Sequence, residues 1–193
     1  MTETRCTTPI EFVDFVDYWA GDLPHATADG IEEHAFTCIE CGRRLAEGEA
    51  LARGIAAVVR EGRFHSIVTD ALLNRLAKDG VRIRMYTLEP GVVVPCSVWA
   101  DDDLVVTRIR ADFSGVDSTT VVTCLASGQE ISRLSDVLVR PGQSEIIDAI
   151  SASLLRRLPP TSVHLTVTGR TATGERTIGE YVLEHAGTID RSS

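Results

Sequence analysis

The hydrophobic period changes near residue 80, and this change restricts the fold more than any other feature of the chain. Before residue 80, apolar residues recur three and four positions apart, as on the buried face of a helix. From Val81 onward, apolar and polar residues alternate, which is typical of strands that bury one face. The sequence therefore predicts an α+β protein, with a helical domain over residues 1–80 and a β domain over residues 81–193.

The helical domain is expected to contain three to four helices. Turn-forming residues at Gly21-Asp22-Leu23-Pro24, at Gly62 and at Asp79-Gly80 separate the periodic segments. The predicted helices cover residues 8–20, 27–37, 40–60 and 64–78.

The second domain is expected to be an antiparallel β-sandwich-like domain. Short alternating segments separated by glycine, proline and aspartate turns are typical of this architecture. One stretch interrupts the series, because its isoleucines and leucines follow helical spacing, and we predict an inserted helix over residues 144–158. The predicted strands cover residues 81–87, 92–99, 104–113, 119–125, 131–139, 163–168 and 177–183.

Three potential metal ligands lie within eight residues of the helical domain: His34, Cys38 and Cys41. Residues four apart lie on the same face of a helix, so the imidazole and the first thiol are expected side by side. Two cysteines separated by two residues can both bind one metal ion. A set rich in sulfur favours one Zn²⁺ ion at this position.

A fourth ligand is needed to close a tetrahedral site, and the candidates are Cys6, His25 and His65. We favour Cys6, because a second helix that returns along the first would bring it close to His34. The resulting Cys6, His34, Cys38 and Cys41 set would be a closed, structural zinc site. Without Cys6, one coordination position would stay open, as in a metalloenzyme.

Charge and motifs limit the function classes. Residues 1–50 contain eleven acidic and three basic side chains, so almost all of the net charge of −9 lies there. Such a region repels phosphate backbones, so we expect no direct binding to nucleic acid. We find no nucleophile-elbow motif, no H-E-x-x-H and no glycine-rich phosphate loop, and therefore expect no enzyme.

The same sequence gives an expectation about location. No apolar run reaches the roughly 18–20 residues of a membrane helix, and the first residues do not resemble a secretory signal. Five cysteines, three of them close to metal-ligand spacing, fit a reducing compartment. We therefore expect a cytoplasmic protein without a membrane partner.

The metal motif resembles that of the zinc-binding anti-sigma factors of bacteria. The resemblance rests on Cys6, on the segment 15–23, and on the His34-x3-Cys38-x2-Cys41 core, with His34 28 positions after Cys6. It covers residues 1–78, and the second half of the chain resembles no family that we can name. Soluble family members with a sensor half usually carry a cupin-like metal barrel, for which this chain has no histidine-rich strand.

The resemblance implies a function. The helical domain would bind a sigma factor of the extracytoplasmic-function type and block its contacts with RNA polymerase, with helix 64–78 lying between two sigma domains. The β domain would be a sensor or an interaction module, and oxidation of Cys6 with Cys38 or Cys41 would be a redox switch. The alternatives are a zinc-stabilised adaptor for another protein and, after it, a metalloenzyme.

Overall fold

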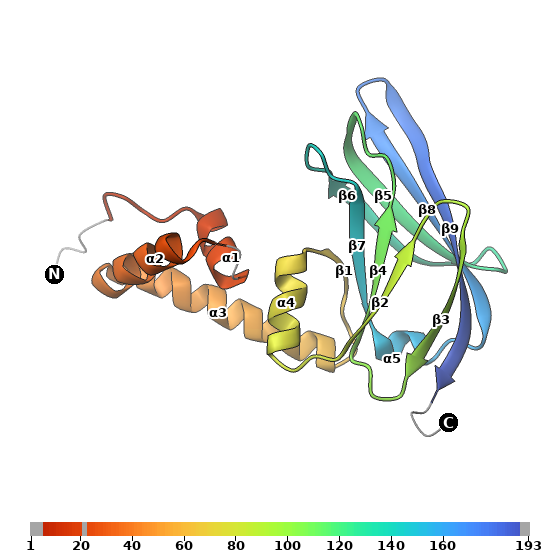
Figure 1. The fold of residues 1–193 in the computed structure, drawn as a ribbon, viewed down its shortest axis with the longest axis horizontal. Helices are drawn as coiled ribbons and strands as arrows, with labels where there is room; N and C mark the ends of the chain where they lie inside the picture. Colours follow the sequence, from red (N-terminus) through yellow and green to blue (C-terminus); the bar gives the residue numbers. More distant parts are fainter. Residues whose placement is uncertain (1–5, 21–22, 190–193) are drawn as a thin grey trace. The chain divides into compact units, whose positions relative to one another are not determined.

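The computed structural model describes residues 6–20 and 23–189, which belong to two compact units. The first unit contains the chain up to Val58 together with Asp70–Gly80, and the second contains Val59–Thr69 and the chain from Val81 onward. Helices dominate the first unit and two β-sheets make up the second (Figure 1). The α+β fold class is therefore confirmed.

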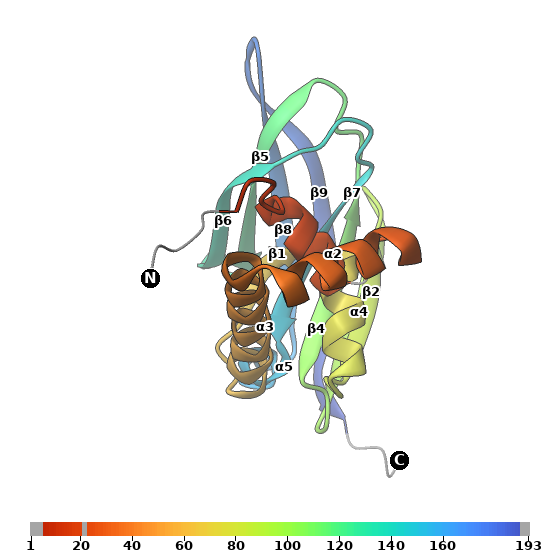
Figure 2. The same ribbon diagram turned by 90° about the vertical axis from the view of Figure 1, so that its left-hand side faces the viewer.

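Three helices of the first unit pack around a small core to which three cysteines contribute. Phe15, Ile31 and Cys41 are buried together, and Cys6 and Cys38 pack against them. Figure 2 shows α2 crossing α3 at a steep angle. The helices are α1 (Phe12–Ala20), α2 (His25–Thr37), α3 (Ile39–Arg60) and α4 (Asp70–Lys78). Gly21 and Asp22 of the expected turn lie outside the described residues.

The fourth helix, α4, begins six residues later than the sequence indicated. Its apolar residues recur three and four positions apart, and two of them, Leu73 and Leu76, are buried. The helix packs against α1. The Arg75 guanidinium lies 5.7 Å from the ring centroid of Trp19 in α1. None of the helices in the described parts of the chain combines the length and the apolar character needed to cross a membrane.

Residues 65–68 form a strand, β1, in the second unit, where a helix was expected. The strand pairs antiparallel with β7, and its paired residues are 79–85 positions further along the chain. This pairing satisfies backbone groups that a helix would otherwise pair internally. Residues 59–69 therefore belong to the β unit, and no single boundary at residue 80 divides the helices from the strands.

The second unit contains two mixed sheets. The order is β1-β7-β4-β2 in the first and β3-β9-β8-β5-β6 in the second. Each includes one parallel pair, β2 with β4 and β3 with β9, so the expected antiparallel pattern holds for the other pairs. The strands are β1 (His65–Val68), β2 (Ile83–Leu88), β3 (Val93–Trp99), β4 (Leu104–Arg110), β5 (Val116–Leu125), β6 (Glu130–Leu138), β7 (Glu145–Ser151), β8 (Thr161–Thr171) and β9 (Gly174–Ile189).

The two sheets share one hydrophobic core. Ile109 of β4 and Ile146 of β7 are fully buried on the first sheet, and Val121, Leu165 and Val167 are buried on the second. Every second side chain of these strands points toward the other sheet and contributes to this core, as in a sandwich. The sandwich-like packing is thus present, although the strand pairing is mixed.

The predicted inserted helix over residues 144–158 is wrong. Residues Glu145–Ser151 form β7, and only Ala152–Leu155 form a short helix, α5. Strand β7 lies between β1 and β4 and buries residues on both of its faces, including Ile146 and Ile147. A strand buried on both faces shows no polar alternation, so its apolar spacing is easily taken for that of a helix.

Candidate metal centre

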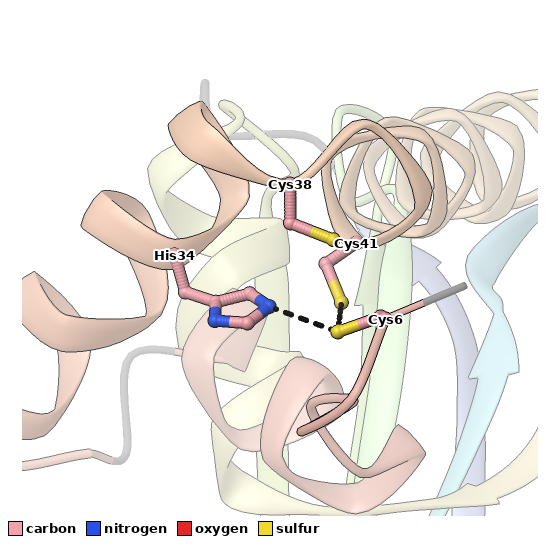
Figure 3. A group of neighbouring side chains, drawn as sticks. All are labelled: Cys6, His34, Cys38 and Cys41. Carbon is pink, nitrogen blue, oxygen red and sulfur yellow. Dashed lines mark hydrogen bonds between the residues drawn. The ribbon is translucent and has the colours of Figure 1, made fainter. Parts of the chain in front are cut away.

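Four side chains that the sequence analysis selected lie together in the first unit. Cys6 comes from the segment before α1, His34 from the last turn of α2, and Cys41 from the first turn of α3. Cys38 occupies the junction between α2 and α3. Figure 3 shows all four pointing toward one another, and their ligand atoms lie within 4.8 Å of each other.

The separations fit a tetrahedral zinc ion. The Sγ of Cys6 lies 3.4 Å from the Nε2 of His34 and 3.9 Å from the Sγ of Cys41. With Zn–S bonds of about 2.3 Å and Zn–N bonds of about 2.0–2.1 Å, tetrahedral geometry requires an S···N distance of about 3.6 Å and an S···S distance of about 3.8 Å. The cluster could therefore hold one metal ion, and three thiolates with one imidazole are a set that Zn²⁺ prefers.

Four protein donors fill all four positions of a tetrahedral ion. A catalytic zinc usually keeps one position for water or substrate, whereas a structural zinc has none free. The arrangement therefore suits a metal that ties segments of the chain together better than one that activates water.

Cys38 has a double role at the junction of the two helices. Its backbone N–H ends α2 by donating to the carbonyl of His34 (2.8 Å), and its own carbonyl accepts the N–H of Gly42 (2.9 Å). Its backbone is extended, with φ −112° and ψ 110°, so the chain changes direction there. The junction thus directs one thiol and the two neighbouring ligands to the same point.

The pKa values of the thiols differ because their surroundings differ. A hydrogen bond from the backbone N–H of Cys41 lowers the pKa of Cys38 to about 7, with further help from the side chains of Cys6, Cys41 and His34. Burial raises the pKa of Cys6, and its hydrogen bonds to the other two thiols raise it further. The thiolate is the form that binds metal, so Cys38, with the lower pKa, binds metal more readily than Cys6 at neutral pH.

The segment that carries Cys6 is held against α3 by hydrogen bonds. The backbone N–H of Cys6 donates to Oε2 of Glu40 (3.1 Å), and Nη1 of Arg44 donates to the carbonyl of Ile10 (3.1 Å). The Arg44 guanidinium also lies 5.5 Å from the ring centroid of Phe15. Glu40 was not among the residues expected at the site, and its place one residue before Cys41 is the local sequence signal for this contact.

Gly42 allows α2 and α3 to approach closely next to the ligands. A Cβ at this position would lie 2.7 Å from the carbonyl oxygen of Ala35 in α2, closer than real Cβ atoms come to other atoms. Glycine is therefore needed for packing here, although it weakens a helix interior.

The two other candidates for the fourth ligand do not join the cluster. His25 begins α2 and is exposed, and His65 lies in β1 of the second unit. Among residues 6–20 and 23–189, the Cys6, His34, Cys38 and Cys41 group is the one set of three or more metal-binding side chains that are close enough to share an ion.

Comparisons with known proteins add little. No protein-family model matches the chain, and no curated protein does. A match among solved structures is the N-terminal domain of phage TP901-1 ORF48, at 13% identity and a TM-score of 0.32, over 54% of this chain and 98% of that one. A likeness of this size supports no statement about fold or function.

Proposed function

We propose that the helical unit is a zinc-stabilised anti-sigma module that sequesters a sigma factor of the extracytoplasmic-function type. The observation that carries the proposal is the Cys6, His34, Cys38 and Cys41 cluster, whose closed donor set suits a structural role. The resemblance of the same residues to zinc-binding anti-sigma factors supplies the class of partner. Binding would block the contacts of the sigma factor with RNA polymerase.

An exposed apolar pair beside the metal ligands supports a role in protein binding. Phe36 and Ile39 are 90% and 93% exposed, and they lie on either side of Cys38 at the junction of α2 and α3. Large apolar side chains this exposed gain most when a partner covers them. A metal at the junction would fix their orientation before binding and so lower the entropic cost of association.

The charge of the unit supports a basic partner. The acidic side chains of residues 1–50 outnumber the basic ones by eight. Sigma factors carry basic DNA-binding surfaces, and complementary charge speeds association. Binding that depends on this charge would weaken as salt is raised.

The fourth helix would need to rearrange if it were to lie between two sigma domains, as the resemblance implies. Leu73 and Leu76 of α4 are buried in the free chain, where α4 packs against α1. An apolar face cannot contact a partner and α1 at the same time. We therefore assign the first contact to Phe36 and Ile39, with α4 engaging afterwards and the β unit acting as the sensor or interaction module.

Co-purification with a sigma factor of the extracytoplasmic-function type from the native host tests the proposal. We expect a stable complex with the full chain, and competition between this complex and core RNA polymerase for the sigma factor. The double variant Phe36→Glu with Ile39→Glu should weaken binding at least tenfold. Met85→Glu, which changes an exposed apolar residue of the β unit, is the matched control and should bind normally.

Two results would reject the anti-sigma function. The first is a metal-loaded chain that does not bind the sigma factor at low salt. The second is a chain that binds another protein through Phe36 and Ile39 while ignoring the sigma factor, which would establish the adaptor function instead.

A redox switch at the same cluster is part of the proposal. The Sγ atoms of Cys6 and Cys41 lie 3.9 Å apart, so peroxide could oxidise the two thiols to a disulfide with little movement of the chain. We expect peroxide to release the metal and the sigma factor together, and a thiol reductant to restore both in the presence of Zn²⁺. Retention of both after oxidation would show that the site is structural only.

A further inference from the structure

A cavity of about 80 Å³ lies between the two sheets of the β unit. A single water molecule needs about 10–15 Å³ on this scale, so the cavity has room for several waters or for a short acyl chain. Most of its lining is apolar, from residues such as Ile131, Ile150, Val163, Leu165 and Leu183. An apolar cavity with a few converging polar groups is the usual form of a site for a small ligand.

The polar part of this cavity includes a serine, a histidine and an aspartate in hydrogen-bond contact. The Oγ of Ser132 lies 3.1 Å from the Nδ1 of His65, and the Nε2 of His65 lies 3.1 Å from the Oδ1 of Asp148. All three residues line the cavity. They come from three strands, β6, β1 and β7, of which β1 contacts both of the others (Figure 1).

The direction of these hydrogen bonds follows from the tautomer of His65, and the tautomer that pairs with a carboxylate has its proton on Nε2. An ionised carboxylate can only accept, so Asp148 holds the proton of a neutral imidazole on Nε2. The Nδ1 atom of His65 then carries a lone pair and accepts the hydroxyl proton of Ser132. This is the form in which an imidazole can remove a proton from a serine.

Burial fits these roles. The side chain of Asp148 is 7% exposed and that of His65 is 20% exposed. The aspartate is thus held where it orients the imidazole, while the histidine and the serine are partly exposed. These three residues form no local sequence motif, because His65 is 67 positions from Ser132 and 83 positions from Asp148.

We propose that this cavity is an acyl-transfer site in which Ser132 is the nucleophile and His65 the base. Asp148 is a positioning residue, which acts through His65. The substrate class is an ester of a short, unbranched carboxylic acid, because the space beside the serine is small and apolar. This activity is separate from the proposed function of the helical unit and does not depend on it.

The reaction runs in two balanced halves. The Oγ of Ser132 forms a bond to the carbonyl carbon of the ester, and its proton moves to Nδ1 of His65. The bond from that carbon to the alcohol oxygen then breaks, and the alcohol leaves with the proton from His65. A water molecule next attacks the acyl-serine, gives a proton through His65 to Oγ, and releases the carboxylic acid.

Ser162 offers a matched control within the same unit. Its Oγ donates to Oε1 of Glu184 at 2.7 Å, so its hydroxyl proton faces a carboxylate instead of an imidazole. A serine of this kind lacks the arrangement that activates Ser132.

The test treats the full chain with a small alkyl fluorophosphonate, whose phosphorus captures an activated serine as the P–F bond breaks. Intact-mass and peptide mass spectrometry should show one phosphonyl group, on Ser132. Ser132→Ala should abolish labelling, and Ser162→Ala should leave it unchanged. p-Nitrophenyl acetate should compete with labelling and be hydrolysed by the unmodified chain.

Two further variants separate the chemical roles from folding. In His65→Gln, the first-order labelling constant should fall about 100-fold or more. In Asp148→Asn, the same constant should fall at least tenfold while the apparent reagent affinity stays the same. Thermal melting identifies a variant that fails to fold, and if His65→Gln does not fold, Asp148→Asn and Ser132→Ala decide the matter.

Absence of a phosphonyl group on Ser132 would overturn the proposal, as would labelling of Ser132 no faster than that of Ser162. Unchanged labelling in folded His65→Gln or folded Asp148→Asn would also overturn it. The three residues would then be a polar contact that links the two sheets.

Discussion

Removal of the metal should unfold much of the first unit and leave the second unit folded. The core around the cysteines contains three buried residues, Phe15, Ile31 and Cys41. At about 1.5–3 kcal/mol each, their burial contributes roughly 5–9 kcal/mol. A structural zinc contributes about 10–16 kcal/mol, so the metal provides the larger share.

The size of the expected change follows from the lengths of the helices. Helices α1 and α2 contain 22 of the 57 helical residues in the described parts of the chain, and α3 adds 22 more. A strong chelator should therefore remove the helical circular-dichroism signal of between 22 and 44 residues. Added Zn²⁺ should restore it. The thermal transition of the β unit should not move, since the core shared by its two sheets consists of residues of that unit.

A matched pair of variants in α2 shows whether the ligands are responsible. His34→Ala removes a donor and should produce the same loss of helix as the chelator, with a zinc content well below one ion per chain. His25→Ala changes an exposed histidine of the same helix and should keep the full helical signal and one zinc ion per chain. A metal-free chain with its full helical signal and an unchanged pattern of proteolysis would refute the reasoning.

Three further predictions concern single side chains. Gly42→Ala should destabilise the first unit by about 1–3 kcal/mol and weaken metal binding, because the new Cβ meets the backbone of α2. Gly48 lies in the same helix with open space around it, so Gly48→Ala should stabilise the unit by about 0.5–1 kcal/mol. Equal changes in the free energy of unfolding of the two variants, measured by chemical unfolding, would contradict this explanation. Ile146→Ala should lower the stability of the β unit by about 2–5 kcal/mol without changing zinc content, since Ile146 is fully buried between the sheets; a loss below 1 kcal/mol would be too small for this position. Burial raises the pKa of Cys96 to about 11, so alkylation of this thiol should be slow at pH 8 and rise about tenfold per pH unit toward pH 11. The thiol ionises near pH 9 in the unfolded chain and near pH 11 in the folded one, so the contribution of Cys96 to stability should be lost between pH 9 and 11. Alkylation of Cys96 at pH 8 at the rate of a free cysteine would show that the thiol is not buried.

Local spacing was enough to predict the α2–α3 junction and three of its ligands. His34, Cys38 and Cys41 lie within eight residues, so the short junction between two successive helices is enough to bring them together. Cys6 needed a further step, because its contact with His34 spans 28 residues and depends on how the segment before α1 lies on α3. Glu40 and Gly42 have visible positions in the sequence, but only the packed helices show what each one does.

The sequence by itself determined that the N-terminal part is mostly helical and that strands dominate after residue 80. It also determined the metal-binding motif, because both depend on residues a few positions apart. Only the tertiary structure decided that β1 joins the β unit, that β7 is a strand, and that His65 meets Ser132 and Asp148. The physical reason is the same in each case. Sheet pairing and cavity lining join residues that are tens of positions apart. The local hydrophobic pattern does not tell which distant segment will form the hydrogen bonds of a strand's backbone or of a buried polar side chain.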